Sequence, residues 1–298
     1  MRTNRVVVRP TSAGTITNNA RAEEAGVTVD SDSEATLVLS QPGSETVQGP
    51  VAAGATATTD SEGDGATSAD PLETSVTTPN SGFVTITEET GGASAPTAFS
   101  FLGHQAAITA PAASPGSPLV LVFLLHASIL PSGTTAANLQ VFRNGALVPS
   151  CTGAPGTASP DPCVSARGTL ADGDAQLTIL TSAASDWTFG SAITARGGVA
   201  GALQPVVGQA TVFGVASNGS AALGLLKHGS YTATRFIALA IDGNKAWFAG
   251  VGRDGRTLLA YVEDNGRNGD GDIFKLWIAG VLQTGDSYLA RGDVGVVR

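Results

Sequence analysis

Aromatic and basic residues are scarce in this sequence. Phe, Trp and Tyr make up 5% of the chain, which predicts cores built from small and β-branched aliphatic side chains. Lys and Arg number 16 against 25 Asp and Glu, and the formal net charge is −9. Because nucleic-acid affinity begins with the neutralisation of phosphates by Lys and Arg, this balance argues against DNA or RNA as a partner.

Long apolar runs are absent as well. The longest run, residues 119–125 (LVLVFLL), is far shorter than the roughly 20 residues that cross a bilayer as a helix. It predicts a buried strand instead. The first residues carry positive charge but no apolar stretch of signal-peptide length. We therefore expect no membrane insertion, and no export signal within these residues.

Glycine, serine and threonine are abundant, with 38 Gly in the chain. This composition favours short strands joined by turns over long helices. Strand-like segments recur about every eight to twelve residues, and turn signals such as Asn144-Gly145 and Asp242-Gly243 separate them. The predicted fold class is all-β, with tandem β-sandwich or meander domains and a flexible acidic linker.

The acidic residues are unevenly distributed. Residues 21–90 contain 13 of the 25 Asp and Glu but a single basic residue, Arg21. Within this stretch the linker segment shows no hydrophobic period and almost no large apolar side chain, so we expect it to be solvated and flexible. A glycine-rich joint at residues 196–201 precedes the last series of strands. The predicted units are an N-terminal segment, the linker, a β-sandwich and a C-terminal antiparallel β domain: residues 1–40, 41–71, 72–192 and 199–298.

Three segments resemble modules of bacterial exported proteins. Residues 10–40 (PTSAGTITNNARAEEAGVTVDSDSEATLVLS) resemble the last strands of the immunoglobulin-like conserved-repeat domain of bacterial surface proteins. Residues 82–190, with the marks VFRNG, CTGAP…SPDPC and DGDAQLTILTS, resemble a β-rich module of secreted actinobacterial multi-domain proteins. The final hundred residues, with AWFAGVGRDGRTLLAYVEDNGRNGDGDIFKLWIAG at residues 246–280, resemble another module often found at the C-terminal end of such proteins. The resemblance implies a secreted or cell-surface location, and it carries no assigned activity.

The function that we expect is therefore a non-catalytic structural or adhesive segment of a secreted or cell-surface bacterial protein. Its partners would be other modules of the same exported chain or components of the cell surface. The alternative is a carbohydrate- or calcium-dependent binding module in the C-terminal domain. The leading interpretation needs no cofactor.

Cys151 and Cys163 are the only cysteines. They flank a loop rich in Gly and Pro, a spacing that suits a local disulfide in an exported protein. Two free thiols in a reducing compartment are the alternative, and without a nearby His the pair does not make a zinc site. We expect the disulfide, whose loop closure contributes on the order of 3 kcal/mol to stability.

An acidic, glycine-rich loop lies near the C-terminus and offers the oxygen ligands that Ca²⁺ takes. With Asp264 in first place, Gly266 falls at the third position of an EF-hand loop and Lys275 where a bidentate Glu belongs. The EF-hand register therefore fails, and a solvated hairpin is the alternative to a generic calcium loop. The candidate calcium ligands are Glu263, Asp264, Asn268, Asp270 and Asp272.

Trp187, Trp247 and Trp277 are candidates for stacking against a polysaccharide, because an exposed aromatic face offers a large contact area. Trp247 and Trp277 lie in segments that alternate like strands, so packing into a core is the competing interpretation. The sequence GVGRDG at residues 250–255 matches the dinucleotide fingerprint. A strand-like segment follows it instead of a helix, so it predicts a hairpin.

Nothing in the sequence marks a catalytic centre. His104, His126 and His228 lack metal-ligand spacing, and no serine stands in a GxSxG frame. A triad assembled from distant strands leaves no signature of this kind. We therefore expect that the protein is not an enzyme.

Overall fold

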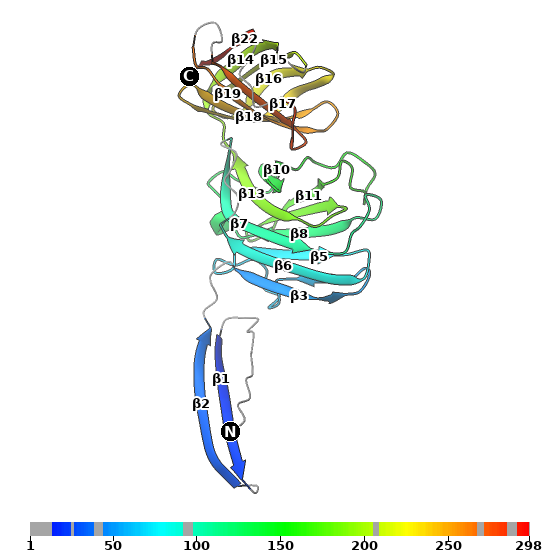
Figure 1. Cartoon of the computed structure of the whole chain (residues 1–298), viewed down its shortest axis with the longest axis vertical. Helices are drawn as coiled ribbons and strands as arrows, with labels where there is room; N and C mark the ends of the chain where they lie inside the picture. The colour runs from blue at the N-terminus through cyan, green and yellow to red at the C-terminus, as the bar shows by residue number, and fades with distance from the viewer. Residues whose placement is uncertain are drawn as a thin grey trace.

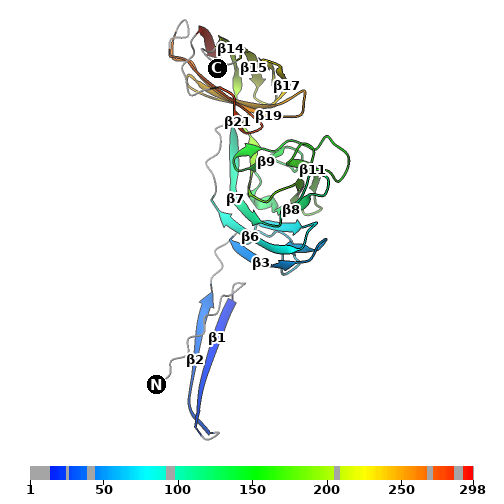
Figure 2. The ribbon, with the colours of Figure 1, turned by 45° about the vertical axis from the view of Figure 1, so that its right-hand side comes forward.

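The computed structural model describes residues 14–24, 27–38, 44–91, 98–204, 209–266, 271–284 and 291–297. Apart from one 3₁₀ turn, η1 (Ala127–Ile129), the regular elements described are strands, so the predicted all-β class is confirmed. A hairpin, a sandwich of two sheets and a curled sheet follow one another along the long axis (Figures 1 and 2).

The N-terminal hairpin consists of β1 (Gly14–Glu24) and β2 (Val27–Val38). The two strands pair antiparallel from Gly14 opposite Val38 to Glu24 opposite Val27. The sequence predicts two short extended segments with a polar, turn-rich stretch between them, but the strands continue through most of that stretch. Residues 1–13 of the predicted N-terminal segment and residues 41–43 of the predicted linker lie outside the described residues.

Two antiparallel sheets form the sandwich. The first has the order β10 (Ala146–Leu147), β9 (Leu139–Arg143), β13 (Asp186–Ala192), β7 (Phe99–Thr109), β6 (Gly82–Thr90), β3 (Glu45–Val51). The second has the order β11 (Cys163–Thr169), β12 (Ala175–Thr181), β8 (Leu119–Leu125), β5 (Leu72–Thr77), β4 (Thr56–Thr58). Alternate residues of each sheet face the other and form the core.

Strand β8 illustrates how the pattern of the sequence becomes a layer. Leu119, Leu121, Phe123 and Leu125 are fully buried, while the residues between them are partly exposed. The prediction of a buried strand in the longest apolar run is confirmed. Phe123 contacts the Phe189 ring of the opposite sheet edge to face, with 4.8 Å between the ring centroids.

The structure corrects the predicted flexible linker over residues 41–71. Residues 45–51 form β3, which pairs with β6 from Glu45 opposite Glu88 to Val51 opposite Gly82. Residues 56–58 form β4, which pairs with β5. Both strands lie at sheet edges, where small and polar side chains are tolerated. The sandwich therefore begins about 27 residues before the boundary at residue 72 that the sequence predicts.

The C-terminal domain is one nine-stranded antiparallel sheet. Its order is β21 (Val281–Leu282), β20 (Ile273–Ile278), β19 (Thr257–Glu263), β18 (Lys245–Gly252), β17 (Tyr231–Asp242), β16 (Ala222–His228), β15 (Thr211–Asn218), β14 (Arg196–Gln204), β22 (Arg291–Val297). The sheet curls around its own apolar side chains, which include Phe213, Phe248 and Phe274. The last strand returns to pair with the first.

The glycine-rich stretch at residues 196–201 is part of strand β14, and not a joint before the domain. A Cβ atom at Gly201 would lie 2.7 Å from the Phe213 ring and 2.9 Å from Val294. Glycine therefore lets the core side chains of the neighbouring strands pack directly against this backbone. The fingerprint-like sequence at 250–255 is the β18–β19 hairpin, so that prediction is confirmed.

Candidate functional site

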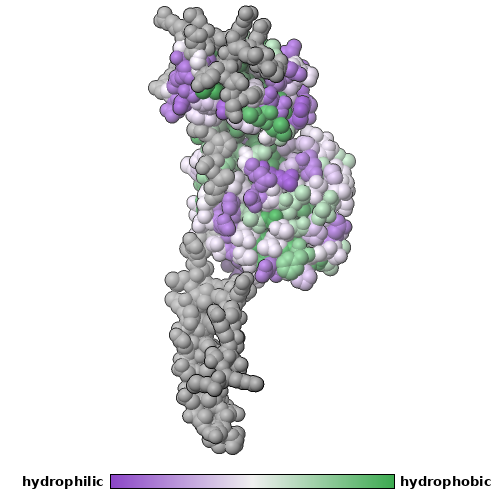
Figure 3. All heavy atoms as spheres, viewed as in Figure 1, coloured by the Kyte–Doolittle hydropathy of each residue, from purple (hydrophilic) through white to green (hydrophobic). Residues whose placement is uncertain are grey.

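A small apolar cluster joins the sandwich to the C-terminal sheet. Phe99 and Phe142 of the sandwich are buried together with Ala238 and Ala249 of the C-terminal sheet. The two Phe rings meet edge to face, with 4.9 Å between their centroids. Figure 3 shows apolar surface at the level where the two domains meet. The outer face of β17 and β18 is therefore covered by the other domain.

Backbone hydrogen bonds reinforce this junction. The Leu239 N–H donates to the carbonyl of Ile193 at 2.9 Å, and the Ala195 N–H donates to the carbonyl of Leu239 at 2.7 Å. These bonds place the segment that leads from β13 to β14 beside β17, where Thr194 and Leu239 form a parallel bridge. The connection between the domains is thus held in the sheet rather than left as a free linker.

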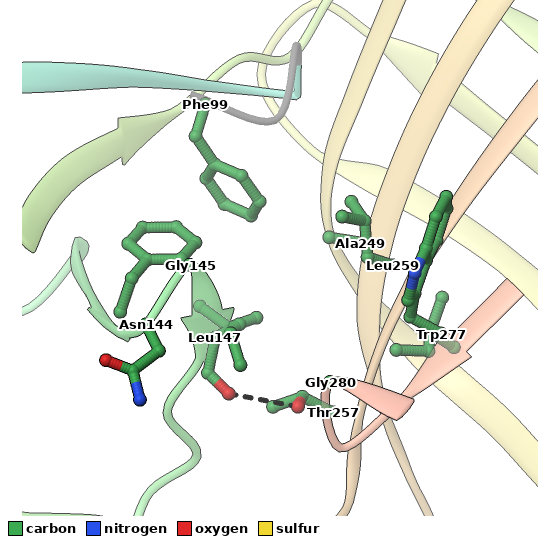
Figure 4. Close-up of a pocket in the computed structure, with 12 residues that line it drawn as sticks. Phe99, Asn144, Gly145, Leu147, Ala249, Thr257, Leu259, Trp277 and Gly280 are labelled. Atoms are coloured by element: carbon green, nitrogen blue, oxygen red, sulfur yellow. Dashed lines mark hydrogen bonds between the residues drawn. The ribbon is translucent and has the colours of Figure 1, made fainter. Parts of the chain in front are cut away.

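A cavity of about 230 Å³ lies at the same junction. In Figure 4, Phe99 and Leu147 from the sandwich face Leu259 and Trp277 from the C-terminal sheet across it. None of the residues that line the cavity is charged. A concave, largely apolar site between two domains is a common location for a small ligand. The lining residues are Phe99, Phe142, Asn144, Gly145, Ala146, Leu147, Ala249, Thr257, Leu258, Leu259, Trp277 and Gly280.

The Asn144-Gly145 turn forms the sandwich side of the cavity mouth. Both residues have positive φ, 49° and 76°, as the predicted type I′ hairpin turn requires. The Asn144 side chain accepts a hydrogen bond from the Ser185 hydroxyl at 2.7 Å, and Figure 4 shows it directed away from the cavity. The polar groups of the turn therefore contribute to the cavity mainly through the backbone.

The three tryptophans occupy different environments. Trp277 points outward from β20, is half-buried and lines the cavity. Trp247 is also half-buried and packs against Tyr261, with 5.0 Å between ring centroids. Trp187 is fully buried in the sandwich core. The prediction that Trp187 is a stacking platform is therefore wrong. Its position on a central strand directs its ring at the opposite sheet, beside Phe123.

The predicted calcium loop uses its carboxylates for backbone contacts. Asp272 is fully buried. Its Oδ1 accepts from the Asn265 N–H at 2.8 Å, and its Oδ2 accepts from the Val294 N–H of β22 at 3.0 Å. Asp264 Oδ2 accepts from Val296 N–H at 3.4 Å. These two carboxylates accept hydrogen bonds from N–H groups of β22, and so hold β22 beside the loop between β19 and β20.

The remaining candidate calcium ligands have other surroundings. Glu263 accepts a hydrogen bond from the Tyr261 hydroxyl; burial, this bond and the charge of Glu263 raise the pKa of Tyr261. Asn268 and Asp270 lie outside the described residues. Within the described ranges no group of three or more His, Cys, Asp or Glu is arranged to hold a metal ion.

The predicted disulfide is present between Cys151 and Cys163. Both sulfurs lie in a small apolar cluster with Ala158 and Leu180. The cysteine loop reaches the other domain, since a Cβ atom at Gly255 would lie 3.9 Å from Cγ2 of Thr152. Closing this loop therefore also fixes a segment that touches the β18–β19 hairpin.

His126 and His228 have local structural partners. The ring Nδ1 of His228 lies 2.7 Å from the Thr211 hydroxyl of the adjacent strand, and burial lowers the pKa of His228. The Nδ1 of His126 accepts from the Ser128 N–H at 3.2 Å and caps η1. Burial lowers the pKa of His104. His126 therefore caps the 3₁₀ turn η1, and His228 takes part in the contact between strands β15 and β16.

One cluster of buried ionisable groups could not be predicted from the sequence. Glu73 and Glu88 are buried between the sheets of the sandwich on either side of Thr59. In the sequence these glutamates look like ordinary surface residues of strands in an acidic region. Only their shared hydrogen-bond partner sets them apart, and that contact depends on how β4, β5 and β6 come together.

No protein-family model, curated protein or solved structure matches this chain. Among the described residues no helix has the length and apolar character needed to span a membrane. We therefore infer the function from the geometry of the junction and of its cavity.

Proposed function

We propose that this chain is a non-catalytic structural or adhesive segment of a secreted or cell-surface bacterial protein. Its role would be to hold neighbouring modules of the same exported chain, or a component of the cell surface, at a fixed spacing. The junction between the sandwich and the C-terminal sheet carries this proposal. A covered apolar cluster and backbone hydrogen bonds are what a rigid spacer needs, because domains joined by a flexible linker move independently.

The Cys151–Cys163 disulfide also supports the proposal, because it suits the oxidising surroundings of an exported protein.

The location is tested on intact cells of the source organism. Antibodies raised against the chain should label unpermeabilised cells or detect the protein in the culture medium, and protease added outside the cells should remove the surface signal. Detection in the cytosol alone would overturn the proposal. Small-angle scattering of residues 44–298 tests rigidity, since a rigid pair of domains gives one defined particle length at all salt concentrations.

A second candidate function is carbohydrate binding at the C-terminal domain, and the observation that favours it is the position of Trp277. Its half-buried ring forms one wall of the cavity, where the apolar face of a sugar ring could stack on it. The uncharged lining selects a neutral sugar over an acidic one. Measuring sugar binding with and without a calcium chelator shows whether this binding depends on calcium at the acidic loop.

The test is a titration with neutral mono- and oligosaccharides followed by tryptophan fluorescence and NMR shifts. Trp277→Ala should abolish binding, while Trp247→Phe, outside the cavity lining and packed against Tyr261, should retain it. Equal melting temperatures of the two variants are needed for the comparison. Absence of any shift with the wild-type chain at millimolar sugar would remove this candidate.

A further inference from the structure

Three polar residues meet inside the sandwich and come from both of its sheets. Glu73 belongs to β5 of the five-stranded sheet and Glu88 to β6 of the six-stranded sheet. Thr59 directly follows β4. The exposed fractions are 0% for Thr59, 5% for Glu73 and 0% for Glu88. Two carboxyl groups are thus removed from water at one place, which is costly unless each is neutral or well paired.

The Thr59 hydroxyl is the common partner. Its Oγ1 lies 2.8 Å from Oε2 of Glu73 and 2.9 Å from Oε1 of Glu88. The same oxygen accepts a hydrogen bond from the Thr74 N–H at 2.8 Å. The hydroxyl therefore has three close partners in addition to its own carbon.

Counting hydrogens shows what this arrangement requires. A hydroxyl has one hydrogen to donate and two lone pairs that accept. The Thr74 N–H occupies one lone pair, so one donor and one acceptor position remain for two carboxyl groups. Thr59 can donate to only one carboxyl. The other must donate a hydrogen of its own, and so at least one of Glu73 and Glu88 is protonated when both bonds are made.

Burial and the charges around the pair both favour protonation of the two carboxyls. Burial is the largest cause and raises the pKa of Glu73 to about 8 and of Glu88 to about 8. Asp60, Asp70 and Glu45 add like charge around Glu73, and Asp70 also acts on Glu88. Hydrogen bonding to the Thr59 hydroxyl opposes these effects. The charged groups that act on the pair in the described part of the chain are all acidic.

We propose that Thr59, Glu73 and Glu88 form a proton-dependent tie between the two sheets of the sandwich, intact while the carboxyls hold a proton and broken when that proton is lost. With both carboxylates ionised, one of the two contacts to Thr59 has no hydrogen. Two negative charges then face each other in the buried region. The tie therefore couples the packing of β4 and β5 against β6 to pH.

The sign of the coupling follows from the proton balance. The unfolded chain releases these protons near the ordinary value of 4.5, whereas the folded chain holds them up to about pH 8. Between these values the folded state binds more protons than the unfolded state, so stability falls as the pH rises. The contribution of the tie is complete in acid and is lost toward pH 8.

The test is urea unfolding of the full chain at several pH values from about 5 to 8.5, the window that these pKa values define. The wild-type midpoint should fall as the pH rises. Glu88→Gln carries a permanent amide donor of nearly the same shape and does not titrate. Its midpoint should therefore fall less steeply and should exceed the wild-type midpoint at the alkaline end. Glu73→Gln should behave in the same way.

Glu89→Gln is the matched control, because Glu89 is exposed on the same strand and pairs with Gln105. It should follow the wild-type curve. Midpoints of Glu73→Gln and Glu88→Gln that fall as steeply as the wild type, or that lie below it at every pH, would overturn the tie.

NMR of ¹³C-labelled glutamate carboxyls tests the same point without substitution, so the proposal stays falsifiable if a variant does not fold. At pH 6 at least one of the two carboxyls should give the signal of a protonated acid. Two ionised signals would overturn the proposal. An intact mass lower by one water would also overturn it, since it would show that the hydroxyl and a carboxyl have condensed instead of sharing a proton.

Discussion

The hydroxyl of Thr257 on β19 donates a hydrogen bond to the carbonyl of Leu147 on β10 at 3.0 Å, although 110 residues separate them in the sequence. This bond crosses the junction at the floor of the cavity, as Figure 4 shows. Thr257 is 3% exposed, so the bond is protected from water. It joins the β9–β10 hairpin of the sandwich to the C-terminal sheet.

Truncation of Phe142 should destabilise the junction strongly. Phe142 is 1% exposed and meets both Phe99 and Phe101 edge to face. Phe142→Ala should lower the free energy of unfolding by about 3 to 5 kcal/mol, the usual cost of a large buried aromatic. Calorimetry should also show the two domains melting less cooperatively. Phe83→Ala, at a residue 58% exposed, is the control and should change stability by less than about 0.5 kcal/mol.

Removing the disulfide should loosen the sandwich next to the C-terminal sheet. The double variant Cys151→Ala, Cys163→Ala should lose about 3 kcal/mol, mainly because the unfolded chain gains freedom. Urea unfolding under non-reducing conditions measures this loss. Alkylation of the unreduced, denatured wild-type protein checks the premise by mass, and two modified thiols would contradict it.

Asp272→Asn should separate a structural from a metal-binding role for the acidic loop. The amide replaces one carboxylate oxygen by a donor, so one of the N–H groups of Asn265 and Val294 loses its acceptor. A buried unpaired donor costs about 1 to 3 kcal/mol, and we expect that loss in a buffer free of divalent cations. Asp242→Asn in an exposed turn should be nearly neutral. No loss for Asp272→Asn without metal would argue against the structural role.

Calcium should not stabilise the chain more than magnesium does at equal ionic strength. Ligands that bind only the folded state raise its stability by mass action. The carboxylates of Asp264 and Asp272 already accept hydrogen bonds from backbone N–H groups, so we expect no such gain from calcium. Differential scanning fluorimetry with each cation at millimolar concentration measures the difference. A rise of several degrees with calcium alone, abolished by Asp270→Ala, would establish the calcium-dependent alternative.

Part of this fold follows from local rules and could be predicted. The apolar alternation of residues 119–125, the Asn144-Gly145 turn and the paired cysteines each depend on a few neighbouring residues, and the structure confirms all three. The hairpin at residues 250–255 is of the same kind. Short-range patterning is sufficient wherever the sequence neighbours are also the structural neighbours.

The errors of the sequence analysis occur where strands pair at long range. Strand β3 has small and polar residues because it is an edge strand with both faces partly exposed, so composition alone made it look like a linker. Strand β14 is glycine-rich because the side chains of β15 and β22 fill the space above its backbone. The burial of Trp187 and Glu88 likewise depends on which sheet lies opposite, and that information is absent from a local window.

The pairing of β14 with β22, which sets Val199 opposite Val296, has a consequence for synthesis of the chain on the ribosome. The first strand of the domain, β14, emerges well before β22, its second neighbour. Until then one side of β14 presents unpaired N–H and C=O groups, which can capture a strand of another nascent chain. Contacts between such distant segments also slow folding. The C-terminal sheet can therefore be completed only once β22 has been synthesised.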